Sequence, residues 1–183
     1  MCCVLIAMAG LPGAGKSAVA GEVAGTLGCA LLSVDPIEAA MWRAGIGREQ
    51  PTGLAAYVVA EQLAREQLLI GNDVIVDAVN DVEPARQQWR SLAGDLGQPL
   101  VFVEVFCSDE DERRLRLTSR QRRIDCFPEP TWESVAERRR GFSDRDDHRV
   151  RLDSMRPLGD IAAAAMAYIA QVRPPEGDDR PAL

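Results

Sequence analysis

The chain reads Gly10-Leu11-Pro12-Gly13-Ala14-Gly15-Lys16-Ser17 near its N-terminus, and this stretch fits the P-loop pattern G-x-x-x-x-G-K-[ST]. In that pattern glycines let backbone N–H groups turn inward around phosphate oxygens, and the next helix points its positive dipole end at the same anion. We expect Lys16 to reach the β- and γ-phosphates of a nucleotide and the Ser17 hydroxyl to ligate Mg²⁺. The predicted nucleotide-binding residues are Gly10, Leu11, Pro12, Gly13, Ala14, Gly15, Lys16, Ser17 and Ala18.

The surroundings of this loop support the same interpretation. Lys16 is the one lysine in a chain that has 21 lysine and arginine residues. An ammonium is a compact point charge and a guanidinium is a planar fork, so a lysine is expected to persist where only an ammonium fits between phosphates. The apolar run 3–9 before the loop predicts a buried strand, and residues 18–27 after it predict a helix that ends at Gly28.

Composition and length indicate a globular protein. The 183 residues, 46% of them hydrophobic, suit one domain with a sizeable core, which we place at residues 1–173 with a disordered tail at 174–183. No apolar stretch is long enough to span a membrane. Five cysteines without C-x-x-C spacing indicate reduced thiols in a cytoplasmic protein. We expect this protein to be a monomer or a homodimer. A net charge of −7 disfavours nucleic acid as a partner, because such binding needs a positive surface.

Strands and helices alternate along the chain, which predicts a three-layer α/β/α fold with a mostly parallel sheet and helices on both faces. Five strands are expected, at residues 3–9, 29–34, 74–77, 100–106 and 149–152. Besides the helix after the P-loop, helices are expected at about residues 52–70, 84–94 and 160–172, and after the caps Ser108 or Asp109 and Thr131.

Two carboxylates follow predicted strands at the sheet edge where the P-loop lies. Ligands of open α/β sheets gather at the carboxyl ends of strands, so Asp35 and Asp77 should lie near Lys16. A carboxylate there can accept the proton of an attacking hydroxyl, or hold Mg²⁺ directly or through water. We assign Asp35 as the base that orients the substrate; alternatively it only caps a helix that begins at Pro36. Asp77 has the alternative of pairing with Arg86.

Arginines crowd the helix predicted after the fourth strand. Arg116 and Arg120 are four residues apart and therefore share one helical face. We predict that they close over the nucleotide, with Arg120 stabilising charge on a transferring phosphoryl group. Arg113, Arg114 and the run 138–140 are interpreted instead as solvated surface residues, because acidic residues stand beside the first two in the sequence.

Four segments in this order resemble one family: GLPGAGKS at residues 10–17, LLSVDPIEAAM at 31–41, VIVDAVNDVEPARQQW at 74–89 and an R-x-x-x-R pair at 116–120. They look like the ATP-binding P-loop kinases that include the kinase domain of polynucleotide 5′-kinases. Chloramphenicol phosphotransferase, gluconate kinase and zeta-type toxins are more distant relatives. The likeness covers about residues 3–145 and implies an adenylate-kinase-like P-loop NTPase fold with an arginine-bearing lid at about residues 116–131.

This resemblance also implies a reaction, the transfer of the γ-phosphate of ATP to a hydroxyl with Mg²⁺ as cofactor. By the family's pattern Lys16, Asp35 and Arg120 are catalytic, with Asp35 activating the acceptor. Asp77 and Arg86 match a segment that organises the acceptor side, and Arg120, with Arg116 nearby, matches the lid arginine that contacts the phosphates.

One position departs from the polynucleotide kinases. There, an arginine three residues after the strand-two aspartate holds the substrate phosphate, whereas this chain has Glu38 at that position. A carboxylate repels a nucleic-acid phosphate, so we place Glu38 in the site of a small acceptor such as a sugar, nucleoside or aminoglycoside. The alternatives are a polynucleotide 5′-hydroxyl kinase and an ATP-binding regulator without turnover. A GTPase would need an N-K-x-D element, and a mechanochemical ATPase would need adjacent acids where Ala78 follows Asp77.

Overall fold

Five parallel strands form the centre of the computed structural model, which describes residues 3–119, 130–143, 145 and 147–173. The strands lie in the order β2-β3-β1-β4-β5, and all four neighbouring pairs run parallel. Their bounds are β1 Leu5–Ala9, β2 Ala30–Ser33, β3 Val74–Asp77, β4 Leu100–Phe106 and β5 Val150–Asp153. The five predicted strands are therefore confirmed, and the sheet is parallel in every described pair.

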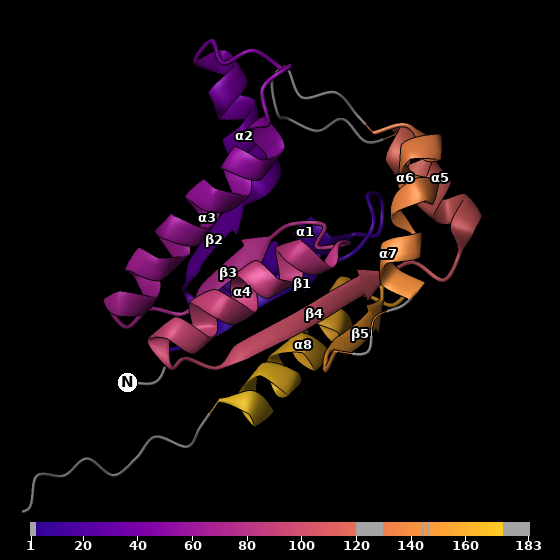
Figure 1. Ribbon diagram of the computed structural model, residues 1–183. Coiled ribbons are helices and arrows are strands. Elements are labelled where there is room, and N and C mark those ends of the chain that lie inside the picture. Colours follow the sequence, from indigo (N-terminus) through magenta and orange to yellow (C-terminus); the bar gives the residue numbers. More distant parts are fainter. Residues whose placement is uncertain (1–2, 120–129, 144, 146, 174–183) are drawn as a thin grey trace, which may run out of the picture.

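Helices cover both faces of this sheet. Their bounds are α1 Lys16–Leu27, α2 Val34–Arg43, α3 Thr52–Leu69, α4 Glu83–Leu96, α5 Glu110–Ser119, α6 Trp132–Arg138, α7 Arg140–Ser143 and α8 Leu158–Val172. Ile6 and Met8 of β1 pack in the core with α1 and α8, whereas Leu5 and Ala7 pack in the core with α3 and α4 (Figure 1). Since both faces are covered, every residue of β1 is buried, and the predicted three-layer α/β/α P-loop NTPase fold is confirmed.

The remaining helices stand around the carboxyl edge of the strands. The α2–α3 pair stands at one end of this edge, and α5, α6 and α7 stand at the other (Figure 1). A short chain of hydrogen bonds joins α2 to α3: the Trp42 indole donates to the Thr52 hydroxyl at 2.9 Å, and that hydroxyl donates to the Glu38 carboxylate at 2.7 Å. The helix pair is thereby fixed as a unit beside the P-loop.

Of the three helix caps inferred from the sequence, two are present in the structure. Asp109 caps α5 by accepting from the Glu112 N–H at 2.9 Å, and Thr131 caps α6 by accepting from the Ser134 N–H at 3.3 Å, as predicted. The alternative reading of Asp35 as a helix cap is wrong. Helix α2 begins at Val34, one residue before Asp35, so Asp35 lies inside the first turn.

Some predicted features lie outside the described residues. These are Arg120, most of the predicted lid and the predicted tail at residues 174–183. Within the described part, none of the helices combines the length and the apolar character needed to cross a membrane.

Candidate active site

The P-loop joins β1 to α1, and its backbone conformation explains its glycines. Gly13 and Gly15 have φ angles of 82° and 84°, in the left-handed region that glycine adopts without steric cost. At Gly10 a Cβ atom would overlap the backbone carbonyl of Val105 in β4, so the loop can pass this strand only without a side chain. Gly15 also occupies the N-cap position of α1, which starts at Lys16. The loop is thus shaped as a cradle at the N-terminus of a helix, where anions bind.

A cavity of about 320 Å³ opens over this cradle. Except for Ala14, all the predicted nucleotide-binding residues of the loop line the cavity: Gly10, Leu11, Pro12, Gly13, Gly15, Lys16, Ser17 and Ala18. Asp35 of α2 and Arg116 of α5 also line the cavity. The fold therefore brings together side chains that lie more than a hundred positions apart in the sequence, such as Leu11 and Arg116.

Lys16 forms an ion pair with Asp77, which ends β3. Both side chains are largely buried, with exposed fractions of 12% for Lys16 and 6% for Asp77. The two residues meet because β1 and β3 are neighbours, with Met8 in register with Asp77. The alternative pairing of Asp77 with Arg86 is wrong, because β3 directs Asp77 to the P-loop while Arg86 folds back under the segment that follows the strand.

Asp35 and Glu38 lie one turn apart on α2, but they differ in their surroundings. Asp35 contributes to the wall of the phosphate cavity, together with Lys16 and Ser17. The Glu38 carboxylate accepts the hydrogen bond from Thr52, which is 4% exposed, and so connects α2 to the start of α3. In the structure, Glu38 therefore accepts a hydrogen bond that joins α2 to α3, the two helices on the predicted acceptor side.

Arg116 reaches from α5 toward the turn that follows β5. Its guanidinium donates to Glu112 at 2.8 Å and to the Ser154 hydroxyl at 2.9 Å. Arg113, one turn earlier, does not lie on a solvated face: it is 7% exposed and its guanidinium lies 4.7 Å from the Trp132 ring centroid. Burial lowers the pKa of Arg113 from its ordinary value. The sequence could not show this, because Trp132 arrives from a later helix.

Comparison with known proteins shows the family to which the chain belongs. The sequence pattern of a family described as "AAA domain" matches residues 5–142. The chain belongs to this AAA domain family. No curated protein sequence matches it.

Solved structures with similar architecture are P-loop proteins of several kinds. They include Kti12 of Chaetomium thermophilum in complex with ADP-AlF3, with 18% identity, a TM-score of 0.71, and coverage of 93% of this chain and 100% of that one. The Mycobacterium tuberculosis APS kinase CysC in complex with AMPPNP and APS has 18% identity and a TM-score of 0.66 over 92% and 98%. A gluconokinase of Sinorhizobium meliloti 1021 has 19% identity and a TM-score of 0.63 over 92% and 92%. This likeness confirms the P-loop kinase resemblance at the level of the fold.

In this AAA domain, the segment after β3 is held by a residue that the sequence did not single out. Asn80 is 0% exposed and has a φ of 53°, the one non-glycine residue with positive φ in the described chain. Its side-chain N–H donates to the Met8 carbonyl at 2.6 Å, and its side-chain oxygen accepts from the Trp89 indole at 2.9 Å. Arg86 donates to the Asn80 and Asp81 carbonyls at 3.1 and 2.9 Å. The segment between Asp77 and α4 is thereby fastened to β1 just before the P-loop.

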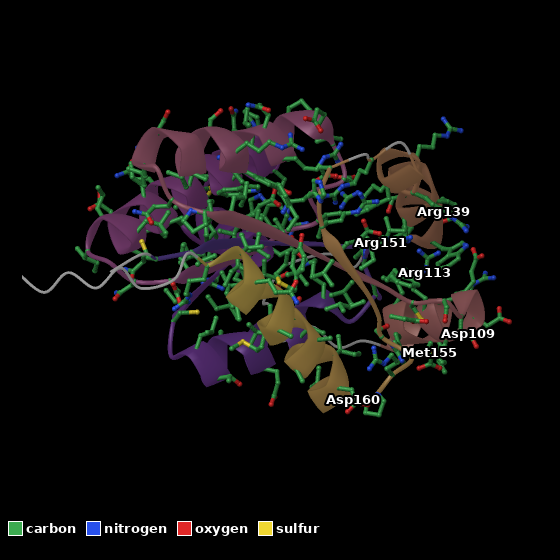
Figure 2. The ribbon with its side chains drawn as sticks, turned by 90° about the horizontal axis from the view of Figure 1, so that it is seen from below. Asp109, Arg113, Arg139, Arg151, Met155 and Asp160 are labelled. Atoms are coloured by element: carbon green, nitrogen blue, oxygen red, sulfur yellow. The ribbon has the colours of Figure 1, made fainter. Side chains whose placement is uncertain are left out.

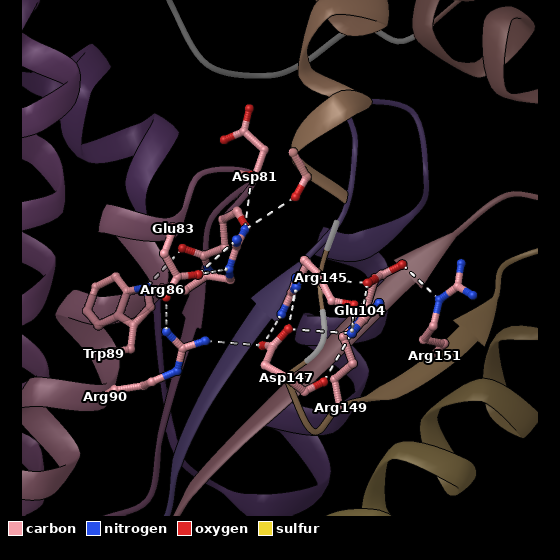
Figure 3. Close-up of polar contacts among 12 residues, drawn as sticks. Asp81, Glu83, Arg86, Trp89, Arg90, Glu104, Arg145, Asp147, Arg149 and Arg151 are labelled. Carbon is pink, nitrogen blue, oxygen red and sulfur yellow. Dashed lines mark hydrogen bonds and ion pairs between the residues drawn. The ribbon is translucent and has the colours of Figure 1, made fainter. Parts of the chain in front are cut away.

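A second feature missed from sequence is a cluster of charges formed by β4, β5 and the segment that precedes β5 (Figure 3). Glu104, 3% exposed, accepts from Arg149 at 2.6 Å and from Arg151 at 3.0 Å. Asp147 binds Arg145 at 2.6 Å and Arg149 at 3.4 Å. The available signal was Glu104 itself, the one charged residue in the otherwise apolar run 100–106.

Proposed function

We propose that this protein is an ATP-dependent kinase that transfers the γ-phosphate of ATP to a hydroxyl group of a small molecule, such as a sugar, nucleoside or aminoglycoside-like compound. The observation that carries the proposal is one cavity in which Lys16 and Ser17 of the P-loop share the walls with the Asp35 carboxylate. A phosphate-binding loop and a proton acceptor that face the same space are what phosphoryl transfer to a hydroxyl requires.

Each group has a distinct task in this proposal. The P-loop backbone and Lys16 bind the phosphates of ATP and hold the γ-phosphate toward the acceptor. Asp35 accepts the proton of the attacking hydroxyl, and it stands on a helix that the Glu38–Thr52 bond fixes in place. Arg116, anchored to Glu112 and Ser154, borders the same cavity and adds positive charge beside the phosphates. The proposed role of Arg120 as a second phosphate-contacting arginine rests on the family resemblance alone.

The residues at the cradle fit Mg²⁺. Magnesium prefers oxygen ligands and keeps several waters, so one hydroxyl and one carboxylate from the protein are sufficient when phosphates supply the rest. The Ser17 hydroxyl is exposed at the start of α1, and Asp77 lies beside Lys16 at the end of β3. We assign Ser17 as a direct ligand and Asp77 as a ligand through water. Bound there with the nucleotide, the ion would offset the charge of the β- and γ-phosphates.

A small acceptor is supported by charge. The protein carries a net charge of −7, and Glu38 stands on α2 next to the proposed base Asp35. Nucleic-acid phosphates would meet carboxylates on this helix, whereas a small hydroxyl compound presents fewer negative charges. The α2–α3 pair is therefore assigned to the acceptor.

The test compares matched acceptors in Mg²⁺-ATP assays that follow ADP release. Nucleosides and 5′-hydroxyl oligonucleotides offer the same hydroxyl group with and without a phosphate backbone, and sugars and aminoglycosides complete the set. Stimulation by a small compound and not by the oligonucleotides supports the proposal. Efficient phosphorylation of oligonucleotides would refute the small-molecule acceptor, and ATP binding without stimulation by any acceptor would favour a nucleotide-binding regulator.

A further inference from the structure

A second cavity, of about 270 Å³, lies on the other side of the P-loop strand. It is bordered by the end of β4 from Glu104 to Ser108 and by three arginines from separate elements: Arg113 of α5, Arg139 after α6 and Arg151 of β5. Figure 2 shows these three arginines gathered at the same end of the molecule. The two cavities share Gly10 and Leu11 in their walls, so a molecule in the second cavity would lie next to the phosphate site.

One buried N–H group of a residue that lines this cavity has no hydrogen-bond partner. In the described part of the chain, the buried side-chain N and O atoms in this condition are Arg113 Nε and Arg145 Nη1. Arg113 lines the cavity. Arg145 does not line it, although its guanidinium is 5.8 Å from the ring centroid of Phe142, a lining residue, and 3.8 Å from the Glu104 carboxylate. A buried donor normally has a partner, so the unsatisfied Nε–H group of Arg113 indicates a missing hydrogen-bond acceptor at this cavity.

Arginines and carboxylates alternate around the cavity. Glu104 is shared by Arg145, Arg149 and Arg151, and Arg113 and Arg139 share Glu110 at 3.7 and 3.5 Å. Among the described residues that line the cavity, three arginines stand beside two carboxylates, Glu104 and Glu110. Guanidinium groups gathered at one cavity attract an anion.

We propose that the second cavity binds an anionic group, a carboxylate or a phosphate, carried by the acceptor molecule. Guanidinium groups bind both anions through paired N–H donors, and an anion that accepts a hydrogen bond from the buried Nε–H group of Arg113 would satisfy this donor. Leu11, Phe106 and Phe142 supply apolar wall for the carbon skeleton beside that group. The identification of this ligand as the phosphate acceptor rests on the proposed kinase function and on Gly10 and Leu11, which line both cavities. Among the proposed acceptors, sugars that carry an acidic group fit, whereas uncharged nucleosides and polycationic aminoglycosides do not.

The test measures anion binding without any turnover. Thermal unfolding of the full chain is followed with Mg²⁺-AMPPNP present, so that the P-loop is filled, while sodium sulfate, phosphate or acetate replaces chloride at constant ionic strength. We expect a saturable rise of Tm with one anion type, sulfate and phosphate standing for a phosphate group and acetate for a carboxylate. Arg139→Gln and Arg151→Gln alter exposed side chains and should each raise the apparent Kd about tenfold.

The matched control is Arg65→Gln, which removes one arginine from the outer side of α3, where it pairs with Glu61 and Asp95. Its anion titration should equal that of the wild type. Equal titrations in all four proteins, or no saturable shift beyond that in chloride, would overturn the proposal. Because no phosphate is transferred in this experiment, an anion site in a protein without kinase activity would leave the inference standing and refute only the proposed function.

Discussion

Lys16 and Asp77 form an ion pair that connects the start of α1, where Lys16 lines the phosphate cavity, to the end of β3. The ammonium that we assign to the phosphates of ATP is thus bound to a carboxylate in the protein without nucleotide. In the proposed reaction, ATP binding draws Lys16 toward the phosphates and leaves Asp77 available to a metal ion. The pair holds the largely buried Lys16 side chain in place in the protein without nucleotide.

Asp77→Asn should destabilise the protein without nucleotide. It replaces a 6% exposed carboxylate whose partner Lys16 is 12% exposed, and removing one member of a buried ion pair costs about 3 kcal/mol in the free energy of unfolding. Urea denaturation measures this loss. Asp95→Asn, which breaks an exposed pair with Arg65, is the control and should cost less than about 1 kcal/mol. Equal losses in both variants would show that the Lys16–Asp77 pair contributes little to stability.

Asp35→Asn should slow phosphoryl transfer about 10²- to 10⁴-fold, because the amide cannot accept the proton of the attacking hydroxyl. The Kd for Mg²⁺-ATP should change little, since the P-loop supplies the phosphate contacts. Single-turnover transfer and equilibrium nucleotide binding measure the two effects separately. Equal losses in both would assign Asp35 to metal or nucleotide binding instead.

Asn80→Asp should weaken the fold next to the P-loop. The substitution places a carboxylate oxygen where a side-chain N–H now donates to the Met8 carbonyl at 2.6 Å, in a position with 0% exposure. Two hydrogen-bond acceptors that face each other, together with a buried charge, should lower the free energy of unfolding by about 2–4 kcal/mol. Asn72→Asp makes the same chemical change at an exposed asparagine and should be nearly neutral. Urea unfolding of both variants gives the comparison, and similar stabilities would contradict the role given to Asn80.

The charge cluster that contains Glu104 and Asp147 should make stability depend on acid pH. Burial acts to raise the pKa of the Asp147 carboxyl, but the hydrogen bonds and charges of Arg145, Arg149 and Arg90 outweigh it and hold that pKa below its ordinary value. A carboxyl with a lowered pKa in the folded state stabilises the protein fully above its unfolded pKa, about 3.9, and loses this effect as pH falls through the folded value.

Asp147→Asn should therefore destabilise the protein at pH 6, and the gap in Tm between wild type and variant should narrow below about pH 4. Thermal unfolding across this range measures the gap. A gap that stays constant down to pH 2.5 would contradict the ion-pair account of Asp147.

The fold and the centre of the site could be predicted from the sequence because both are coded locally. The glycines at 10, 13 and 15 fix the cradle, and the polar ends of two apolar strands give Asp35 and Asp77. Since parallel strands end at one edge, their order along the chain is enough to bring these groups together.

What could not be predicted are pairings that depend on tertiary packing. The sequence placed Asp77 near Lys16, but it left open a pairing of Asp77 with Arg86, and the register of β1 with β3 decides for Lys16. Arg113 looks solvated beside its acidic neighbours, yet Trp132 from α6 covers it. Glu104 and its arginine partners are separated by more than forty residues, so no local pattern connects them.

The most direct test of the proposed phosphoryl transfer is Mg²⁺-ATP turnover across a panel of hydroxyl acceptors, with Lys16→Ala as the control. Circular dichroism must first show that this variant is folded, since the substitution removes the ammonium beside Asp77. The account predicts that one class of small hydroxyl compound stimulates ADP release by the wild type and that Lys16→Ala abolishes the stimulation. Unchanged turnover in folded Lys16→Ala would contradict it.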